Sequence, residues 1–208
     1  MALYHRATIV PSKADLVATW APTQSWYPAG EETEVVGAFR FDDPLGQVGM
    51  ETHLVRAGST LLQVPLTYRD APLDHVADDR FVGTTEHSAL GTRWVYDGLI
   101  EAPYLMMLAG AAMTGQGEAL GMVDYDGRWH IAPSGVRLTG GGWGAERVAV
   151  DDFSITTETD TQTELRNDGF ALTFHRQLTP LDGDRPPLGL TAAWEGQPAV
   201  LLARIRQL

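Results

Sequence analysis

The chain has 208 residues and a formal net charge of −12, because 27 Asp and Glu outnumber 15 Lys and Arg. Such an acidic surface repels nucleic-acid backbones and anionic lipid, so we expect no nucleic-acid partner and no membrane partner. The chain has no cysteine, which excludes disulfides and thiolate chemistry, and its longest apolar stretch, residues 104–113, is too short to span a bilayer. These features predict a cytoplasmic protein.

The first third of the chain predicts a short helix and then a run of strands. Ser12, followed three residues later by Asp15, is typical of a helix N-cap with its capping box, and the helix is expected to end at Trp20. Three strand-like runs follow, at residues 34–41, 47–55 and 61–68. Because the turn DDPLG joins the first two, they predict an antiparallel hairpin that continues into a three-stranded meander.

The middle of the chain predicts two more short strands and then the clearest helix of the sequence. The strands lie within residues 83–98. The helix is expected over residues 102–114, with Pro103 near its first position and Gly115 as a left-handed stop. Its apolar side chains cover a broad face, so we expect this helix to be buried against the sheet.

The second half of the chain repeats the pattern of strand, tight turn and strand. The turns are expected at Asp126-Gly127, at residues 167–169 and at Glu195-Gly196. The run TGGGWG at residues 139–144 separates the two halves, and we interpret it as a hinge or tight turn because no Gly-Lys-Ser/Thr follows it. The pattern predicts an α+β fold that is mainly antiparallel β, divided into residues 1–138 and 139–208, which pack as one unit.

Three segments together resemble one protein family. They are WAPTQSWYPAG (20–30), VGAFRFDDPLGQVGMETHLV (36–55), and VPLTYRDAPL (64–73) followed by GTTEHSALGTRWVYDG (83–98). The chain is similar here to the maltokinase N-terminal cap domain, and to short free-standing bacterial proteins that sometimes carry names linked to glucan branching. The resemblance extends over residues 1–115. It implies that residues 1–138 form a curved, cystatin-like cap sheet with one main helix.

The hairpin-rich part, residues 139–208, resembles a degenerate kinase N-lobe. In that resemblance Thr173 occupies the place of the lysine that pairs with nucleotide phosphates. A threonine cannot hold phosphates as a cation does, and Glu158, Asp160 and Glu164 nearby would repel them. The chain also departs from the family by lacking a His-Gly-Asp catalytic loop and an Asp-Phe-Glu metal motif. The resemblance therefore implies no active kinase, and the chain is too short for the (β/α)8 barrel of a branching enzyme.

The densest polar and aromatic cluster holds five candidate site residues, namely His87, Arg93, Trp94, Tyr96 and Asp97. In a functional interpretation, an aromatic ring stacks on a sugar while the polar side chains bind its hydroxyls. In a structural interpretation, Arg93 pairs with Asp97 and the two aromatic residues share one strand face. Hydrolysis by Ser88 with His87 as its base is disfavoured, because neighbouring residues on a strand point to opposite faces.

A second cluster, Gln24, Trp26 and Tyr27, is interpreted either as a ligand or partner surface or as a set of aromatic anchors at the helix exit. The six histidines are scattered and form no metal-binding pattern. The nearest acidic neighbour that would share a strand face with any of them is Glu51, two residues before His53. We therefore expect no metal site and no cofactor.

The resemblance and the missing kinase motifs favour a non-catalytic accessory or regulatory protein of maltose, trehalose and α-glucan metabolism. Its partner would be a separate kinase or glucan-metabolism enzyme, or a small sugar. The alternative is a sugar-binding enzyme or sensor, whose pocket would lie between the sheet and the helix at residues 102–114, lined by His87, Arg93 and Tyr96.

Overall fold

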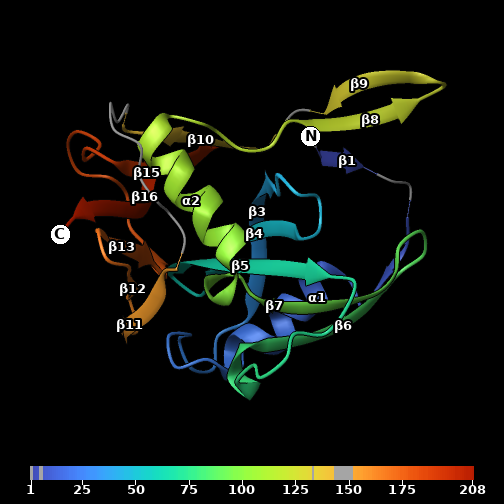
Figure 1. Cartoon of the computed structure of the whole chain (residues 1–208), viewed down its shortest axis with the longest axis horizontal. Helices are drawn as coiled ribbons and strands as arrows, with labels where there is room; N and C mark the ends of the chain where they lie inside the picture. Colours follow the sequence, from blue (N-terminus) through green and yellow to red (C-terminus); the bar gives the residue numbers. More distant parts are fainter. Residues whose placement is uncertain (1, 5–6, 133, 143–151) are drawn as a thin grey trace.

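The computed structural model describes residues 2–4, 7–132, 134–142 and 152–208. Within these residues the chain forms two α-helices and three β-sheets, and nearly all of the strand pairs are antiparallel (Figure 1). The predicted α+β class, dominated by antiparallel strands, is confirmed.

The largest sheet is built from the first half of the chain, with one short strand from the second half. Its order is β2-β6-β7-β5-β4-β3, and β14 also pairs with β5, all antiparallel. The strands are β2 (Ile9–Val10), β3 (Thr33–Asp42), β4 (Gly49–Ala57), β5 (Thr60–Arg69), β6 (Phe81–His87), β7 (Gly91–Asp97) and β14 (Gln177–Leu178). The predicted hairpin, meander and two later strands are confirmed.

Helix α1 (Lys13–Trp20) covers one face of this sheet. It begins at the predicted N-cap, where the Ser12 hydroxyl accepts from Asp15 N at 3.2 Å and the Asp15 carboxylate accepts from Ser12 N at 3.0 Å. Its apolar side is buried in a cluster with apolar side chains of β4, β5 and β7. A 3-10 turn, Ala21–Thr23, follows at the predicted helix end.

Helix α2 (Ala102–Thr114) has the predicted bounds and packs on the opposite face of the same sheet. Successive strand residues point to opposite faces, and accordingly Leu54 of β4 belongs to the core around α2, whereas Val55 belongs to the core around α1. Gly115 ends α2 with a φ of +75°, as predicted. The chain crosses α2 closely at Gly140, where a Cβ atom would stand 1.9 Å from the carbonyl oxygen of Ala111.

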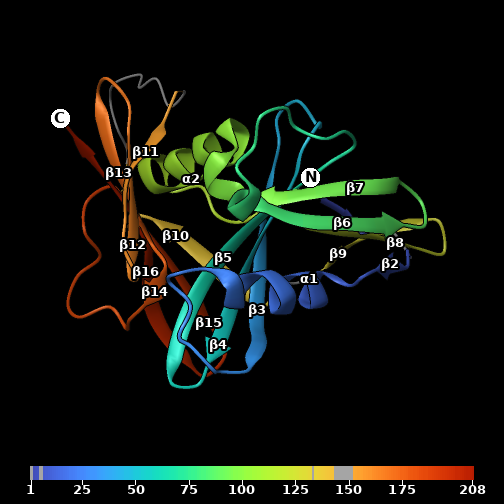
Figure 2. The same ribbon diagram turned by 90° about the horizontal axis from the view of Figure 1, so that it is seen from below.

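A second sheet covers the other side of α2, so that the helix lies between two sheets (Figure 2). Its order is β10-β15-β16-β13-β12-β11. The strands are β10 (Val136–Gly140), β11 (Ser154–Glu158), β12 (Gln162–Arg166), β13 (Phe170–His175), β15 (Gly189–Trp194) and β16 (Gln197–Gln207). Gln63 of β5 joins the two sheets, because its buried amide donates to His175 O and Leu202 O, each at 3.0 Å.

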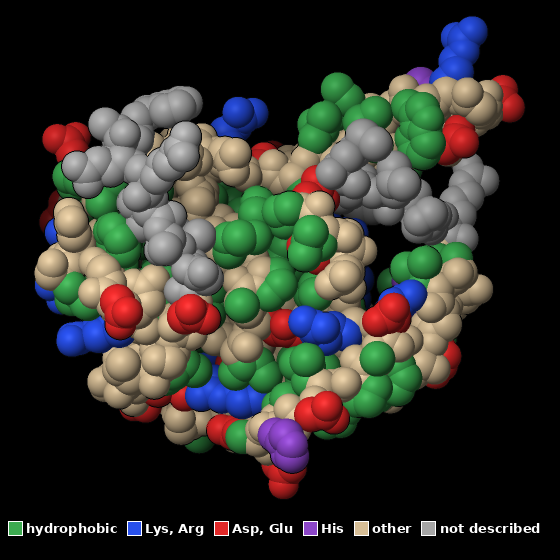
Figure 3. All heavy atoms as spheres, in the orientation of Figure 1, with side chains coloured by type: hydrophobic (Ala, Val, Ile, Leu, Met, Phe, Trp, Pro, Cys, Tyr) green, Lys and Arg blue, Asp and Glu red, His purple; other side chains and the backbone are tan. Residues whose placement is uncertain are grey.

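The third sheet is a small arm that extends from the body of the molecule (Figures 1 and 3). It has the order β1-β8-β9, with β1 (Ala2–Tyr4) parallel to β8 (Gly121–Tyr125) and β8 antiparallel to β9 (Arg128–Ala132). The predicted turn at Asp126-Gly127 joins the two arm strands. The predicted turns at residues 167–169 and 195–196 likewise join β12 to β13 and β15 to β16.

The predicted division between residues 138 and 139 falls inside β10. The assignment of residues 1–138 and 139–208 as two parts stays a prediction, and so does the likeness of the second part to a kinase N-lobe. Of the run TGGGWG, Thr139 and Gly140 end β10, while residues 143 and 144 lie outside the described part of the chain. Neither helix in the described residues has the length and apolar character needed to cross a bilayer.

Candidate ligand pocket

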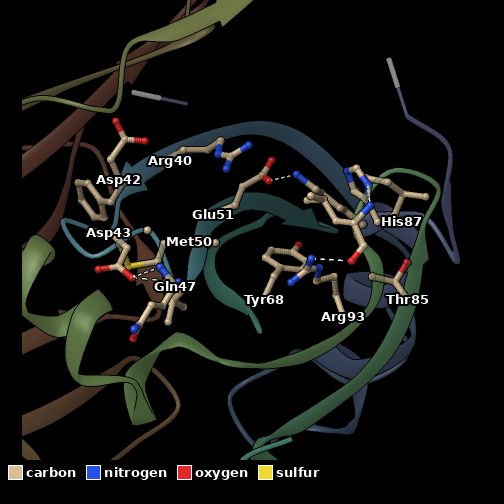
Figure 4. A pocket seen from close by; sticks show the side chains of 17 residues that line it. Arg40, Asp42, Asp43, Gln47, Met50, Glu51, Tyr68, Thr85, His87 and Arg93 are labelled. Carbon is tan, nitrogen blue, oxygen red and sulfur yellow. Dashed lines mark hydrogen bonds and ion pairs between the residues drawn. The ribbon is translucent and has the colours of Figure 1, made fainter. Parts of the chain in front are cut away.

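A cavity of about 460 Å³ opens on the α1 side of the seven-stranded sheet, beside the N-terminus of that helix (Figure 4). Both edge strands and the strands between them contribute to its wall. The lining residues are Ile9, Lys13, Arg40, Phe41, Asp42, Asp43, Gly46, Gln47, Val48, Gly49, Met50, Glu51, Tyr68, Thr85, His87, Leu90 and Arg93. Its volume falls within the range typical of small-molecule sites.

The start of α1 places a cation at one side of this pocket. The hydroxyl of Thr85 on β6 donates to Pro11 O at 2.7 Å and so fixes the segment that leads into the helix. The capping box at Ser12 then sets the first turn. Lys13, in that turn, forms an ion pair with Glu51 of β4, and its ammonium lies 5.4 Å from the ring centroid of Tyr68.

Glu51 is the central acceptor of the pocket. It stands opposite Arg40 in the β3–β4 pairing, so the two side chains share a face. Burial alone raises the pKa of Glu51, but the charges of Lys13, His53 and Arg40 outweigh it, and the pKa lies below its ordinary value. Burial, followed by the Glu51 carboxylate, raises the pKa of Tyr68 well above its ordinary value. The pocket therefore holds an ionised carboxylate beside a protonated phenol at neutral pH.

Three buried polar atoms of the pocket residues have no hydrogen-bond partner in the described part of the chain: Arg40 Nε, Arg93 Nε and Tyr68 Oη. Arg93 is anchored by its Nη2 atom, which donates to Leu90 O at 2.6 Å. In Figure 4 the side chains of Arg40 and Glu51 face those of Tyr68 and Arg93 across the cavity. Since nearly all buried polar groups in proteins are paired, unpaired atoms gathered around a cavity indicate a ligand or water site.

The β3–β4 loop forms a fixed rim at the other end of the pocket. Both oxygens of the Asp43 carboxylate accept backbone N–H groups of its own loop, from Leu45 at 3.0 Å, Gln47 at 2.8 Å and Val48 at 2.9 Å. This carboxylate is therefore used to shape the turn, whereas the largely buried Glu51 carboxylate lines the cavity and pairs with Lys13.

The structure separates the predicted cluster of residues 87–97. His87 and Arg93 line the pocket, whereas Trp94 is half-buried beside Arg69 and Thr84 in neighbouring strands. Tyr96 is buried, and its hydroxyl accepts from Leu73 N at 2.9 Å. The cavity thus lies on the opposite face of the sheet from the one expected, because the interface with α2 is filled by apolar side chains and Tyr96 does not line the pocket.

The expected pairing of Arg93 with Asp97 is wrong. Four residues along a strand span about 13 Å, which is too far for a salt bridge. Asp97 is instead fully buried, and its Oδ2 accepts from Arg80 Nη1 and from Arg176 Nη2, each at 2.7 Å. Both arginines also pair with Glu158, so four charged residues join the first half of the chain to the second.

The second predicted cluster lies in the core and beside it. Trp26 is buried, and the guanidinium carbon of Arg176 lies 4.8 Å from its ring centroid, a cation–π contact. The hydroxyl of Tyr27, also buried, lies 2.7 Å from Thr33 Oγ1. The side chain of Gln24 donates to Asp79 O at 3.3 Å. None of these three residues lines the pocket.

Thr173, at the position where the resemblance implies a lost lysine, lies on β13 opposite Glu164. Its hydroxyl donates to the Glu164 carboxylate at 2.7 Å. Thr163 in turn donates to Glu158 at 3.0 Å. Glu158 and Thr163 lie on the core face of this sheet, so Glu164 is the carboxylate that stands beside Thr173 on the other face.

One family matches part of the chain by sequence, the maltokinase N-terminal cap domain, over residues 20–100. Over these residues the chain is similar to that domain. The comparison with curated proteins gave no match. The family links the chain to maltokinase-related α-glucan metabolism.

The matched segment, residues 20–100, supplies most of the pocket, from Arg40 to Arg93, while Ile9 and Lys13 come from the segment before it. The sequence predictions missed Lys13, Arg40, Glu51 and Tyr68. The predicted hairpin, closed by residues 41 and 47, places Arg40 opposite Val48, whereas the observed hairpin is closed by Asp42 and Gly49 and places Arg40 opposite Glu51. Within the described ranges, no three His, Asp or Glu side chains are grouped so as to hold a metal ion.

Proposed function

We propose that the chain is a non-catalytic, cytoplasmic accessory protein of maltose, trehalose and α-glucan metabolism that binds a small sugar in the pocket of its cap domain. The observation that carries this proposal is the gathering of unpaired buried atoms of Arg40, Arg93 and Tyr68 around one cavity. The cap-domain family supplies the metabolic context.

The chemistry of the pocket suits a ligand with many hydroxyl groups. Each sugar hydroxyl both donates and accepts, so it can accept from a guanidinium and donate to a carboxylate. Arg40 and Arg93 supply the donors, Glu51 supplies the acceptor, and Tyr68 supplies a ring and a hydroxyl. The unpaired atoms are covered by the side chains around them, so the proposal requires those side chains to rotate when a ligand binds.

The non-catalytic part of the proposal is supported by the surroundings of Thr173. A triphosphate placed there would meet the carboxylate of Glu164, with a threonine hydroxyl in place of the phosphate-pairing cation. We therefore expect no heat of binding when Mg-ATP is titrated into the protein. Saturable binding of Mg-ATP in the micromolar range would contradict this part of the proposal.

Sugar binding is tested by thermal-shift screening with maltose and trehalose, followed by calorimetry. A ligand that binds only the folded protein raises its melting temperature. Substitution Arg40→Met should abolish the shift, because it removes the guanidinium and keeps an unbranched side chain. The matched control is Arg56→Met, on the neighbouring strand β4, which has similar partial exposure and does not line the pocket. Equal shifts in both variants, or no shift in the wild type, would refute sugar binding in this pocket.

Contact with a separate kinase or glucan-metabolism enzyme is the second candidate. It is favoured by the interface between α2 and the sheet, which is filled by a continuous apolar core. Co-purification from the native host tests this candidate. Recovery of the chain without any such enzyme would count against it.

A further inference from the structure

The arm formed by β8 and β9 carries large apolar side chains in solvent. Trp129 is 57% exposed and Ile131 is 64% exposed, and both are on β9. Figure 3 shows hydrophobic side chains along this arm, where it extends from the body of the molecule. β9 is the outer strand of its sheet and pairs with no described strand except β8. An edge of this kind is a template for pairing with another strand.

The turn at the tip fixes which backbone groups of β9 face outward. Asp126 and Gly127 have φ values of +54° and +73°, which is the pattern of a two-residue type I′ turn. In such a hairpin the closing pair, here Tyr125 and Arg128, exchanges backbone hydrogen bonds, and every second pair does the same. Residues 128, 130 and 132 therefore point their N–H and C=O groups toward β8. Trp129 and Ile131 point theirs toward the free edge.

We infer that β9 pairs with β9 of a second copy of this chain, antiparallel and about a twofold axis at His130. In this register Trp129 stands opposite the partner subunit's Ile131, and Ile131 stands opposite the partner subunit's Trp129. The outward N–H and C=O groups of both residues are then all used in four backbone hydrogen bonds. A one-residue shift would leave some of them unpaired, so the pattern specifies its own register.

The side chains support the same pairing. Trp129 and Ile131 are on one face of β9, so the seam brings both pairs together as a continuous apolar strip. Arg128 stands opposite the partner subunit's Ala132, so no like charges face each other at that position. β9 contains no carboxylate, although the whole chain carries a charge of −12. The seam is short, so association is expected to be reversible and concentration-dependent.

A single cysteine tests the register directly, because the chain has none of its own. In the proposed pairing the two copies of residue 130 form a non-hydrogen-bonded pair, whose Cα atoms lie about 4.5 Å apart, within the range of a disulfide. His130→Cys should therefore crosslink two copies under mild oxidation. The control Arg128→Cys, in which the two thiols would be separated by about 13 Å, should not. Equal crosslinking of both variants, or of neither, would overturn the inference.

Sedimentation velocity over a concentration series provides the second test. Ile131→Pro removes an outward N–H that β8 does not use, so the arm should remain folded while dimer formation is lost. The control Tyr125→Ser removes a side chain that is 61% exposed and belongs to the strand away from the seam, and it should leave the dimer intact. A wild-type protein that stays monomeric at every concentration would refute the pairing, whatever other protein binds the arm.

Discussion

The buried charges that join the two halves of the chain allow one sharp stability prediction, for the substitution Asp97→Asn. The Asp97 carboxylate is fully buried and accepts from Arg80 and from Arg176, each at 2.7 Å. Arg176 is itself fully buried, and its Nε and Nη1 atoms have no hydrogen-bond partner among the described residues. Removing the negative charge while keeping the shape leaves Glu158 to pair with both cations, with the exposed Asp79 as a further partner of Arg80.

The expected cost follows from these contacts. Breaking a buried ion pair by removing one charge typically costs about 3–5 kcal/mol, because the other charge is left uncompensated. Glu158 still pairs with Arg80 and lies 3.5 Å from Arg176, so the lower end, about 3 kcal/mol, is expected. For a chain of this size that loss lowers the melting temperature by about 6–12 °C.

Urea denaturation followed by tryptophan fluorescence measures this loss, with Asp79→Asn as the matched control. Asp79 lies 3.8 Å from the same Arg80 but its side chain is 65% exposed. An exposed pair of this kind contributes little, so the control should change the free energy of unfolding by about 0.5 kcal/mol or less. If Asp97→Asn costs no more than this control, the buried network does not hold the two halves together.

Three further predictions concern the rest of the fold. Burial, and then Lys13, lower the pKa of His53 despite the nearby Glu51. The unfolded chain therefore takes up a proton at this histidine more readily than the folded chain, and the free energy of unfolding should fall as the pH drops below about 6.5. The substitution His53→Phe should reduce that fall in denaturation series at several pH values. Trp94→Ala should lower the free energy of unfolding by about 1–2 kcal/mol, because Trp94 is half-buried and a fully buried tryptophan is worth about 3–5 kcal/mol. A loss of stability above about 3 kcal/mol, measured by melting, would contradict this. Gly140→Ala should cost about 3 kcal/mol or more, since its Cβ would overlap the backbone of α2, and an unchanged melting temperature would refute that close crossing.

The local features of the fold could be predicted because their causes lie close together in the sequence. The capping box at Ser12 and Asp15 marks the start of α1, and Gly115 marks the end of α2. The Asp126-Gly127 turn has the backbone pattern that its residues favour. Signals within a few residues are independent of how the chain later packs.

The site was harder to predict because it depends on how distant strands come together. His87 and Arg93 were among the candidate residues and do line the pocket, but Lys13, Arg40 and Tyr68 reach it from separate elements. Asp97 was expected to serve a ligand or a local arginine. Its partner Arg176 is 79 residues away, and no pattern near residue 97 indicates it.

The measurement that bears most directly on sugar binding is a nuclear magnetic resonance titration that follows the Nε–H signals of the arginine side chains. With maltose or trehalose, the signals of Arg40 and Arg93 should shift in a saturable way, because a bound hydroxyl would supply the partner that these atoms lack. The signal of Arg204, which is exposed on β16 and does not line the pocket, should stay in place. If the signals of Arg40 and Arg93 do not move, or move no more than that of Arg204, the pocket does not bind these sugars.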